Sequence, residues 1–413
     1  MMINYSKITR CRICNSSNLK SIIDLGSQPL ANNLQKNFFK KELKIPLKVT
    51  FCKVCKTSQL THTVNPKLLF SKYLWVTKTS SVVKKYSKFF VRKVLKHVKI
   101  NSKPFILEIA SNDGTFLKEF KNQGCKVLGI DPAKNISNKA NKSGIKTVSK
   151  FFNEETALFI KKNYNLPDLI FARNVIPHVA EIHSVVKGIS NLCSKNTLVC
   201  IEFHYAKFII QDLHYDSIYH EHLFYFTLET ITNLFKKYNL LPYDCFLSPI
   251  SGGSIVLFFS KNKKKKSNKL LNIINVENKL KLNNILTWKN FNKKIIKHSI
   301  ELNKCLEFCS KKTKIIGYGA SARSSTLLNF LKINNNNIEF IIDKNKLKEN
   351  LFTPGSKIKI LSFESGITKI SNHFILILAW NFEKEIISAL KERLKKFKIK
   401  TKFIIPLPKI KII

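Results

Sequence analysis

Residues 219 to 222 read Tyr-His-Glu-His, the densest group of proton-handling side chains in the chain. The group holds two of the ten histidines and one of only 26 acidic residues, against 72 basic ones. Imidazole titrates near neutral pH, a carboxylate can orient it, and a phenol can donate to a developing oxyanion. The group could be a catalytic base with its support, a metal site or a chance polar cluster. It lacks the two-His helical spacing of zinc hydrolases, which disfavours a metal site.

The local conformation decides which of these side chains can cooperate. In an extended segment Tyr219 and Glu221 would share one face, and His220 and His222 the other. In a helical turn Tyr219 and His222 would align. Either geometry gathers only part of the group, and we expect His220 to be a structural hydrogen-bonder. The other histidines outside the candidate site are expected to be ordinary surface or core residues (positions 62, 97, 183, 204, 214, 298 and 373).

A second chemical motif lies at the N-terminus, where Cys11-x-x-Cys14 and Cys52-x-x-Cys55 form two knuckles. Each knuckle brings two thiolates to one ion, and two knuckles complete a tetrahedral zinc site. Four thiolates leave no open position, so the zinc is predicted to be structural, in a small module over residues 1–65. A redox dithiol is the alternative, but neither pair has a strand-to-helix context. The remaining six cysteines are predicted to be buried small hydrophobes (positions 125, 193, 200, 245, 305 and 309).

The bulk composition bounds the class of protein. A length of 413 residues indicates two or three domains, and 44% apolar residues is typical of globular chains. No stretch is long and apolar enough for a membrane span, and no apolar signal region opens the chain, so we expect a cytoplasmic protein.

The net charge of +46 would normally indicate a nucleic-acid or anionic-surface binder. However, the 72 basic residues are 66 Lys and 6 Arg, and phosphate and base recognition relies on the planar Arg fork. Asn, Ile and Phe are also abundant, so we interpret the charge as a signature of A/T-rich codons. The run 261–266 is then predicted to be a solvated linker rather than a nucleic-acid patch.

Behind the zinc module, strands alternate with helices. A helix is expected over about 80–98, followed by strands at 105–110, 126–130, 169–172 and 197–202, with a mostly helical stretch from Asn174 to Leu192. Alternation of this kind predicts a parallel, doubly wound α/β sheet, in a domain over residues 66–255. Residues 256–310 have helical spacing and are expected to connect it to a smaller α/β domain over 311–413, with strands at 314–316, 338–342 and 374–380.

Two loops in these domains have the form of nucleotide sites. The first, Glu108-Ile-Ala-Ser-Asn-Asp-Gly114, follows a strand and opens a helix, and Asp131 ends the next strand. An acid at the strand end followed by a degenerate glycine loop is the pattern of class I S-adenosylmethionine (SAM) methyltransferases. The second, Gly317-x-Gly-x-x-Ala322 with Asp343 further on, matches a dinucleotide fingerprint better. It could hold NAD, seat a nucleotide-linked substrate with Arg323 on a pyrophosphate, or be a tight turn without a ligand.

Taken together, these segments resemble the SAM-dependent sugar C-methyltransferases, which act on nucleotide-linked 4-keto-deoxysugars. The resemblance runs nearly end to end and is most specific in the zinc knuckles and in Asp216-Ser-Ile-Tyr-His-Glu-His222. Further matches are segments 25–32, 107–117, 317–323 and 378–382. Three positions depart from the family: Ala110 replaces a usual Gly, Ser251 stands where a His usually precedes Gly252-Gly-Ser254, and Arg323 occupies a position often held by Lys.

The resemblance implies a zinc module, a central SAM domain and a C-terminal Rossmann-like domain, with the sugar nucleotide bound between them. It implies Tyr219, Glu221, His222 and His178 as active-site residues. The SAM site would include Glu108, Ala110, Asn112, Gly114, Asp131 and Asn174, and the substrate would contact Tyr73 and Arg323. No nucleic-acid, membrane or protein partner is implied.

The residues suit carbon methylation independently of the resemblance. A hydrogen next to a ketone becomes acidic once the enolate oxygen is stabilised. We expect His222 to be the base, oriented or tuned by Glu221, with Tyr219 and His178 as donors to the enolate oxygen, at carbon 3 of the sugar. Three alternatives stay open: an NAD-dependent sugar-nucleotide oxidoreductase, a zinc-containing RNA methyltransferase, and a family member that has lost catalysis.

Overall fold

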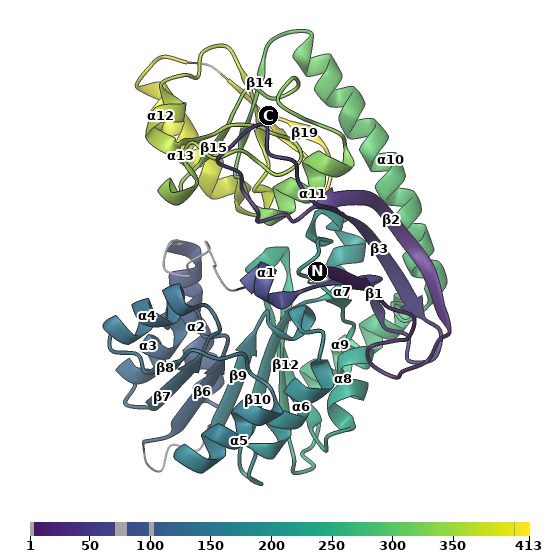
Figure 1. The fold of residues 1–413 in the computed structure, drawn as a ribbon, viewed down its shortest axis with the longest axis vertical. Helices are drawn as coiled ribbons and strands as arrows, with labels where there is room; N and C mark the ends of the chain where they lie inside the picture. Colours follow the sequence, from purple (N-terminus) through teal and green to yellow (C-terminus); the bar gives the residue numbers. More distant parts are fainter. Residues whose placement is uncertain (1–3, 71–80, 99–102, 400) are drawn as a thin grey trace.

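Two α/β domains and a β-rich N-terminal module make up the protein, which is described by a computed structural model over residues 4–70, 81–98, 103–399 and 401–413. In Figure 1 the C-terminal domain lies at the top and the central domain at the bottom. The long strands β2 and β3 of the N-terminal module run beside helix α10 along one side, so all three parts meet near the middle of the molecule. No helix of the described residues has the length and apolar character required to cross a membrane.

The N-terminal module is built on a four-stranded sheet in the order β11-β4-β3-β2, beside a two-stranded β1-β5 pair. Its elements are β1 (Tyr5–Lys7), β2 (Leu19–Pro29), β3 (Lys44–Cys52), β4 (Ser58–Leu60), β5 (His62–Val64) and α1 (Pro66–Phe70). The fourth strand, β11 (Phe224–Tyr225), comes from the far-away segment that directly follows the Tyr-His-Glu-His group. The module therefore holds that group from one side.

The central domain contains a seven-stranded sheet in the order β12-β13-β10-β9-β6-β7-β8. Its strands are β6 (Phe105–Ile109), β7 (Lys126–Ile130), β8 (Thr147–Val148), β9 (Leu169–Arg173), β10 (Leu198–His204), β12 (Leu241–Ser248) and β13 (Ser254–Ser260). Strands β6 to β10 are parallel, and their sequences are nearly continuous apolar runs because helices cover both faces. The helices are α2 (Ser81–Leu95), α3 (Thr115–Asn122), α4 (Lys134–Lys142), α5 (Glu154–Asn163), α6 (Ile182–Asn191), α7 (Ala206–Gln211) and α8 (Leu228–Lys236).

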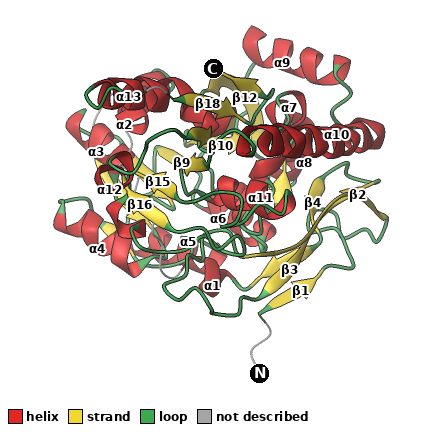
Figure 2. Ribbon diagram, turned by 90° about the horizontal axis from the view of Figure 1, so that it is seen from above, coloured by secondary structure: helices red, strands yellow, loops and turns green. Residues whose placement is uncertain are grey.

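The C-terminal domain follows two connecting helices, α9 (Asn268–Lys279) and α10 (Ile285–Ser310). Its sheet has the order β16-β15-β14-β17-β18-β19, parallel except for the last pair. The strands are β14 (Ile315–Tyr318), β15 (Ile341–Asp343), β16 (Ile360–Ser362), β17 (Phe374–Ile377), β18 (Lys402–Ile405) and β19 (Lys411–Ile412), and the helices are α11 (Ala322–Phe330), α12 (Phe363–Ile367) and α13 (Glu383–Lys395). Seen from above in Figure 2, α10 lies across the molecule beside α11 and β2.

The structure confirms the alternation of strands and helices and corrects three details. The central sheet is not wholly parallel, because β12 and β13 form an antiparallel pair at one edge. The segment 256–310 does not begin as a helix, since β13 extends to Ser260 and pairs with β10. The stretch after Asn174 does not continue as one helix. Asn174 has a left-handed backbone (φ 51°), and a short 3-10 helix, η2 (Ile176–His178), precedes α6.

The exposed run 261–266 forms the loop between β13 and α9, as expected of a solvated linker. Five of the six cysteines outside the knuckles are buried, as predicted, whereas Cys305 is half-buried.

Candidate active site and metal centre

Four thiols converge in the N-terminal module. The Sγ atoms of Cys11, Cys14, Cys52 and Cys55 all lie within 4.8 Å of one another, with two Sγ–Sγ distances of 3.5 Å. A tetrahedral zinc ion with Zn–S bonds of about 2.3 Å requires sulfur atoms roughly 3.8 Å apart. The amide of Gln59 donates to Sγ of Cys11 at 3.0 Å, as expected for a thiolate ligand. The cluster therefore fits a closed, structural zinc site.

Gln59 also connects this metal centre to the Tyr-His-Glu-His group. It lies on β4, where it is paired with Phe224 of β11, and Leu60 donates its amide to the carbonyl of Leu223. Arg12, between the two cysteines of the first knuckle, donates to both Gln59 and the Leu60 carbonyl. The geometry of the zinc site is thus transmitted through one strand to the residue that follows His222.

The expected SAM-site residues gather at the carboxyl edge of the central sheet. Glu108 lies in β6, Asp131 directly follows β7, and Asn174 directly follows β9, and these three strands are neighbours. Ligands of open α/β sheets bind at this edge. The loop after β6 has left-handed backbone at Ala110 and Asn112 (φ 54° and 50°), which keeps it close to the strand ends.

Asp131 organises that loop. Its Oδ2 accepts from the amide of Asn112 and its Oδ1 from the amide of Ala133, both at 2.9 Å. Burial raises the pKa of Asp131, and these two amide hydrogen bonds oppose the rise. Glu108 is more deeply enclosed: burial raises its pKa well above the usual range, and its Oε2 has no hydrogen-bond partner among the described residues.

A glycine is required at the end of the same loop. Gly114 has φ 73°, and a Cβ there would lie 2.8 Å from the side chain of Ile145. Its replacement would push the loop away from the sheet.

The Tyr-His-Glu-His group forms a tight turn, in which the amide of His222 donates to the carbonyl of Tyr219. This is the alignment expected of a helical turn: the hydroxyl of Tyr219 lies 2.8 Å from Nε2 of His222, and their ring centroids are 4.0 Å apart. Nδ1 of His222 lies 2.7 Å from the carbonyl oxygen of Ser217. A carbonyl oxygen only accepts, so Nδ1 carries the hydrogen, and Nε2 of the neutral ring accepts from Tyr219.

His178 is brought in by η2, as the sequence anticipated. Its ring packs edge-on against His222 with centroids 4.8 Å apart, and the amide of Leu223 donates to the carbonyl of Pro177. Burial lowers the pKa of His178 to about 4, and burial together with His178 and His204 lowers the pKa of His222 well below its usual range. Both imidazoles are therefore neutral at pH 7, and Nε2 of His222 has a lone pair available for a proton.

Glu221 does not orient His222, contrary to the expectation from sequence. Both ring nitrogens of His222 have other partners, and Oε1 of Glu221 instead accepts from the side-chain amide of Asn32 at 2.6 Å. Its Oε2 is buried without a partner among the described residues. Burial raises the pKa of Glu221 to about 7, and the Asn32 amide opposes this rise. Glu221 therefore titrates in the physiological range.

Nε2 of His220 lies 3.1 Å from the carbonyl oxygen of Ile45 in β3, so this nitrogen donates to the N-terminal module. That contact agrees with the structural part expected for it. The four side chains of the turn therefore form two pairs: Tyr219 and His222 are partly exposed, whereas His220 and Glu221 are buried.

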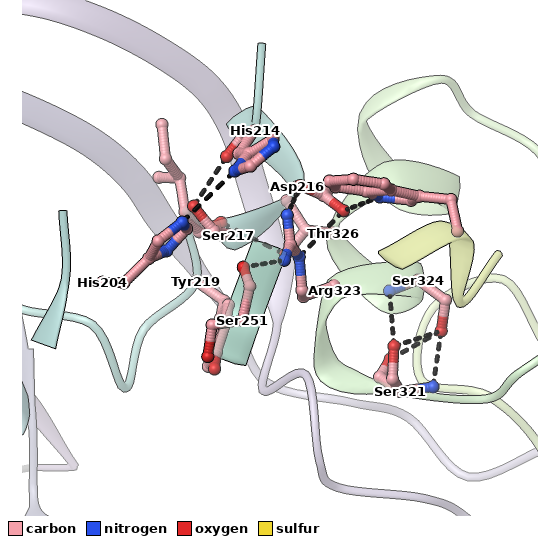
Figure 3. Close-up of polar contacts among 12 residues, drawn as sticks. His204, His214, Asp216, Ser217, Tyr219, Ser251, Ser321, Arg323, Ser324 and Thr326 are labelled. Carbon is pink, nitrogen blue, oxygen red and sulfur yellow. Dashed lines mark hydrogen bonds and ion pairs between the residues drawn. The ribbon is translucent and has the colours of Figure 1, made fainter. Parts of the chain in front are cut away.

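Three residues that lie at or beside the site were not predicted from the sequence, because no local motif marks them. Asn32 is the last residue of the segment 25–32 that resembles the family, and its side-chain amide donates to Glu221. His204 and His214, expected to be ordinary, form a buried pair with a 3.2 Å nitrogen–nitrogen distance beside the turn. Figure 3 shows this pair next to Ser217. Burial and the Arg323 charge lower the pKa of His214 to about 2.

Arg323 and the Gly317 loop are placed differently from a nucleotide-binding expectation. Arg323 forms a bidentate ion pair with Asp216 (2.7 and 3.0 Å), which lies three residues before Tyr219. A Cβ on Gly317 or Gly319 would lie within 2.9 Å of Ile341 and Leu378 or of Ala379, so packing alone requires both glycines. Asp343 accepts from the amide of Ala320 inside the loop. These contacts favour the tight turn without a ligand. Tyr73 lies outside the described residues.

Comparison with known families divides the chain into three matched parts. A zinc binding domain family matches residues 11–70, a methyltransferase domain family matches 83–242, and the C-methyltransferase C-terminal domain family matches 249–408. Among curated proteins, the chain is similar to C-methyltransferase NovU of Streptomyces niveus, with 28% identity over 411 residues that cover 98% of this chain and 97% of that protein.

Two solved structures to which the chain is similar each cover less than half of it. Magnesium protoporphyrin IX methyltransferase from Synechocystis PCC 6803 with bound SAM is 8% identical, covering 43% of this chain and 79% of that one with a TM-score of 0.34. The PH0226 protein from Pyrococcus horikoshii OT3 is 12% identical, covering 47% and 97% with a TM-score of 0.35. The sheet order, the four-cysteine site and the three family matches together identify the chain as a SAM-dependent C-methyltransferase with an N-terminal zinc-binding domain.

Proposed function

We propose that the protein methylates a carbon next to the ketone of a nucleotide-linked 4-keto-deoxysugar, at carbon 3. The observation that carries this proposal is the Ser217–His222–Tyr219 arrangement, which presents a neutral imidazole with a fixed tautomer. Carbon methylation requires removal of a C–H proton, and an imidazole whose Nε2 carries no hydrogen is suited to that step.

The residues that would hold the methyl donor are those of the β6–α3 loop and the neighbouring strand ends. Glu108, Asn112 and Asp131 line this edge, and Asp131 keeps the loop close to it. When bound there, SAM supplies an electrophilic methyl group on a sulfonium sulfur. His178 follows the adjacent strand β9, so the loop and the His178–His222 pair share one edge of the sheet.

His222 would perform the proton transfer. Its Nε2 takes the proton from the carbon next to the ketone, and the C–H electron pair becomes the carbon–carbon double bond of the enolate. The carbonyl of Ser217 then stabilises the resulting imidazolium through Nδ1. The enolate carbon would then use its electron pair to form the new C–C bond with the methyl group that SAM supplies, and the electron pair of the S–CH₃ bond would stay on sulfur.

Tyr219 would have two successive partners. Its hydroxyl first donates to Nε2 of His222, which fixes the ring before substrate arrives. It would then turn to the ketone oxygen, which releases Nε2 and stabilises the enolate. His178, beside His222, is the second candidate donor to that oxygen. The zinc ion would take no part, since four thiolates complete its coordination.

Incubation of the protein with SAM and thymidine-, CDP- or GDP-linked 4-keto sugars tests this proposal. We expect one product heavier by a single methylene, with the methyl group on carbon in its NMR spectrum. In deuterated water the substrate should also exchange the hydrogen at that carbon, and His222→Asn should abolish both reactions while calorimetry shows unchanged SAM binding. Methylation on oxygen or nitrogen, or near wild-type turnover of His222→Asn, would overturn the assignment.

Calorimetry with SAM and with NAD also tests the alternative function, an NAD-dependent oxidoreductase. Binding of NAD without binding of SAM would favour the oxidoreductase. The matched C-methyltransferase domain at residues 249–408, which contains the Gly317 loop, supports the opposite result.

A further inference from the structure

The C-terminal domain reaches the catalytic segment through one buried carboxylate. Asp216 lies in the 3-10 helix η3 (Tyr215–Ser217), and its side chain is 1% exposed. Its Oδ1 accepts from Nη2 of Arg323 at 2.7 Å, and its Oδ2 accepts from Nε of Arg323 at 3.0 Å and from Nε1 of Trp380 at 2.8 Å. Figure 3 shows the guanidinium facing Asp216 across the domain boundary. Three charge-assisted hydrogen bonds on one carboxylate hold it in a single orientation.

Residues near Asp216 in the sequence and in space also form hydrogen bonds with the C-terminal domain. Oγ1 of Thr326 on α11 donates to the carbonyl of Ile218 at 3.1 Å. Nη1 of Arg323 donates to the carbonyl of Ser251 at 2.8 Å, and the guanidinium lies 4.7 Å from the centroid of the Trp380 ring. Ser217 thus lies between two residues that are both bonded to the C-terminal domain.

Ser217 is also the residue that sets the tautomer of His222. Its carbonyl oxygen accepts from Nδ1 of His222 at 2.7 Å. A rotation of the peptide between Asp216 and Ile218 would move this acceptor and with it the imidazole ring. A displacement of about 1 Å in a catalytic group can lower a rate by on the order of 100-fold.

Arg323 is therefore poorly available as a ligand for a pyrophosphate. All three of its nitrogens donate to Asp216 or Ser251, and its side chain is only 14% exposed. Release of Arg323 to a ligand would leave the buried carboxylate of Asp216 without its partner, which is energetically costly.

We propose that Asp216, Arg323 and Trp380 are positioning residues through which the C-terminal domain fixes the orientation and tautomer of His222. This inference rests on the proposed function for the part that His222 plays in catalysis. Its structural content, the coupling from Asp216 to the His222 ring, holds for the protein without substrate.

The first experiment needs no substrate. The full chain is labelled with ¹⁵N-histidine, and the His222 signals are identified by their loss in His222→Asn. In the wild type we expect the shifts of a single Nδ1–H tautomer. Asp216→Asn, which keeps the shape but removes the charge, should shift them toward a mixture of tautomers. The matched control is Asp212→Asn, in the same segment, which should leave them unchanged. Unchanged His222 signals in Asp216→Asn would overturn the coupling.

The second experiment separates positioning from substrate binding. Arg323→Lys and Arg323→Met are compared with the wild type for kcat and for KM of the sugar nucleotide. We expect kcat to fall on the order of 100-fold in Arg323→Met, with partial rescue in Arg323→Lys, which keeps the charge but not the bidentate fork. Trp380→Phe, which loses one donor and keeps a ring, should lower kcat roughly tenfold. Unchanged SAM affinity confirms that each variant is folded.

The outcomes distinguish this inference from the proposed function. A raised KM with unchanged kcat in the Arg323 variants would make Arg323 a substrate ligand and overturn the inference. If the wild type methylates no sugar nucleotide but the His222 signals move in Asp216→Asn, the positioning unit is supported and the proposed substrate fails.

Discussion

The side-chain amide of Asn32 donates a 2.6 Å hydrogen bond to Oε1 of Glu221, across 189 residues of sequence. Asn32 belongs to the N-terminal module and is exposed, whereas Glu221 is buried in the Tyr-His-Glu-His turn. The zinc-binding module therefore also contributes to the Tyr-His-Glu-His turn, because its Asn32 is the hydrogen-bond partner that the structure describes for Glu221.

Asn32→Ala should therefore destabilise the site more than a neighbouring change. The variant removes the hydrogen bond from the Asn32 amide, which favours the ionised form of Glu221. Neither oxygen of this buried carboxyl would then have a partner among the described residues. We expect a cost of about 1–3 kcal/mol in the free energy of unfolding at pH 8, where Glu221 is ionised, and a smaller cost at pH 5.5. Urea unfolding measures both values. Asn33→Ala, an exposed neighbour, is the control, and equal effects of the two variants would contradict the argument.

The stability of Glu221→Gln should increase relative to that of the wild type as the pH rises. The folded-state pKa of Glu221 is about 7, above its usual value of 4.5, because burial disfavours the charge. The folded state therefore holds this proton more tightly than the unfolded state. The stability that this provides is complete below pH 4.5 and is lost as the pH rises through about 7. Between pH 4.5 and 8 the free energy of unfolding of Glu221→Gln should increase relative to that of the wild type by up to about 3 kcal/mol.

Gln keeps an oxygen to accept from Asn32, so the comparison isolates the charge. Unfolding by urea at several pH values gives the difference, and Glu392→Gln, at an exposed position of α13, should show no such trend. A pH-independent difference for Glu221→Gln would show that the carboxyl does not titrate in this range.

Tyr219→Phe should lower kcat without removing the ring that packs on His222. The variant loses the hydroxyl that donates to Nε2 and, in the proposed reaction, stabilises the enolate. Loss of one oxyanion donor lowers kcat on the order of 10²- to 10³-fold. Steady-state kinetics with the sugar nucleotide measures it.

The chain offers a close control for Tyr219→Phe in a second tyrosine–histidine pair. The hydroxyl of Tyr238 lies 2.7 Å from Nδ1 of His183, beside the zinc module. Tyr238→Phe should keep nearly full activity, and an equal loss in both variants would indicate general destabilisation instead of a loss at the site.

Removal of zinc should disturb the Tyr-His-Glu-His turn as well as the N-terminal module. Cys14→Ser removes one of four ligands, and structural zinc sites contribute apparent binding energies on the order of 10 kcal/mol. Because Gln59 contacts Cys11 and pairs with Phe224, loss of the metal should loosen the pairing of β4 with β11, the strand that follows the turn. We expect loss of bound zinc, a lower melting temperature and a lower kcat. Cys305→Ser, at a half-buried cysteine on α10, should retain zinc and activity.

Much of this protein could be predicted from local sequence. The two Cys-x-x-Cys knuckles specify a tetrahedral site because the spacing alone brings paired sulfurs together. The alternation of apolar strands and helices specifies a doubly wound sheet, and the carboxyl edge of that sheet collects Glu108, Asp131 and Asn174 wherever the rest of the chain goes. The local alignment of Tyr219 with His222 was likewise one of the two geometries expected from their spacing.

The partners inside the site depended on tertiary structure. Sequence proximity suggested that Glu221 orients His222, but the turn directs Glu221 to Asn32 and leaves the carbonyl of Ser217 for His222. Arg323 suggested a phosphate ligand because it opens a helix after a glycine loop, yet it lies against Asp216, 107 residues away. Sequence alone determined which chemical groups are present and which sheet edge they occupy, since those follow from spacing and periodicity. Only the packing of three domains decided which groups touch, because hydrogen bonds between distant segments leave no periodic trace in the chain.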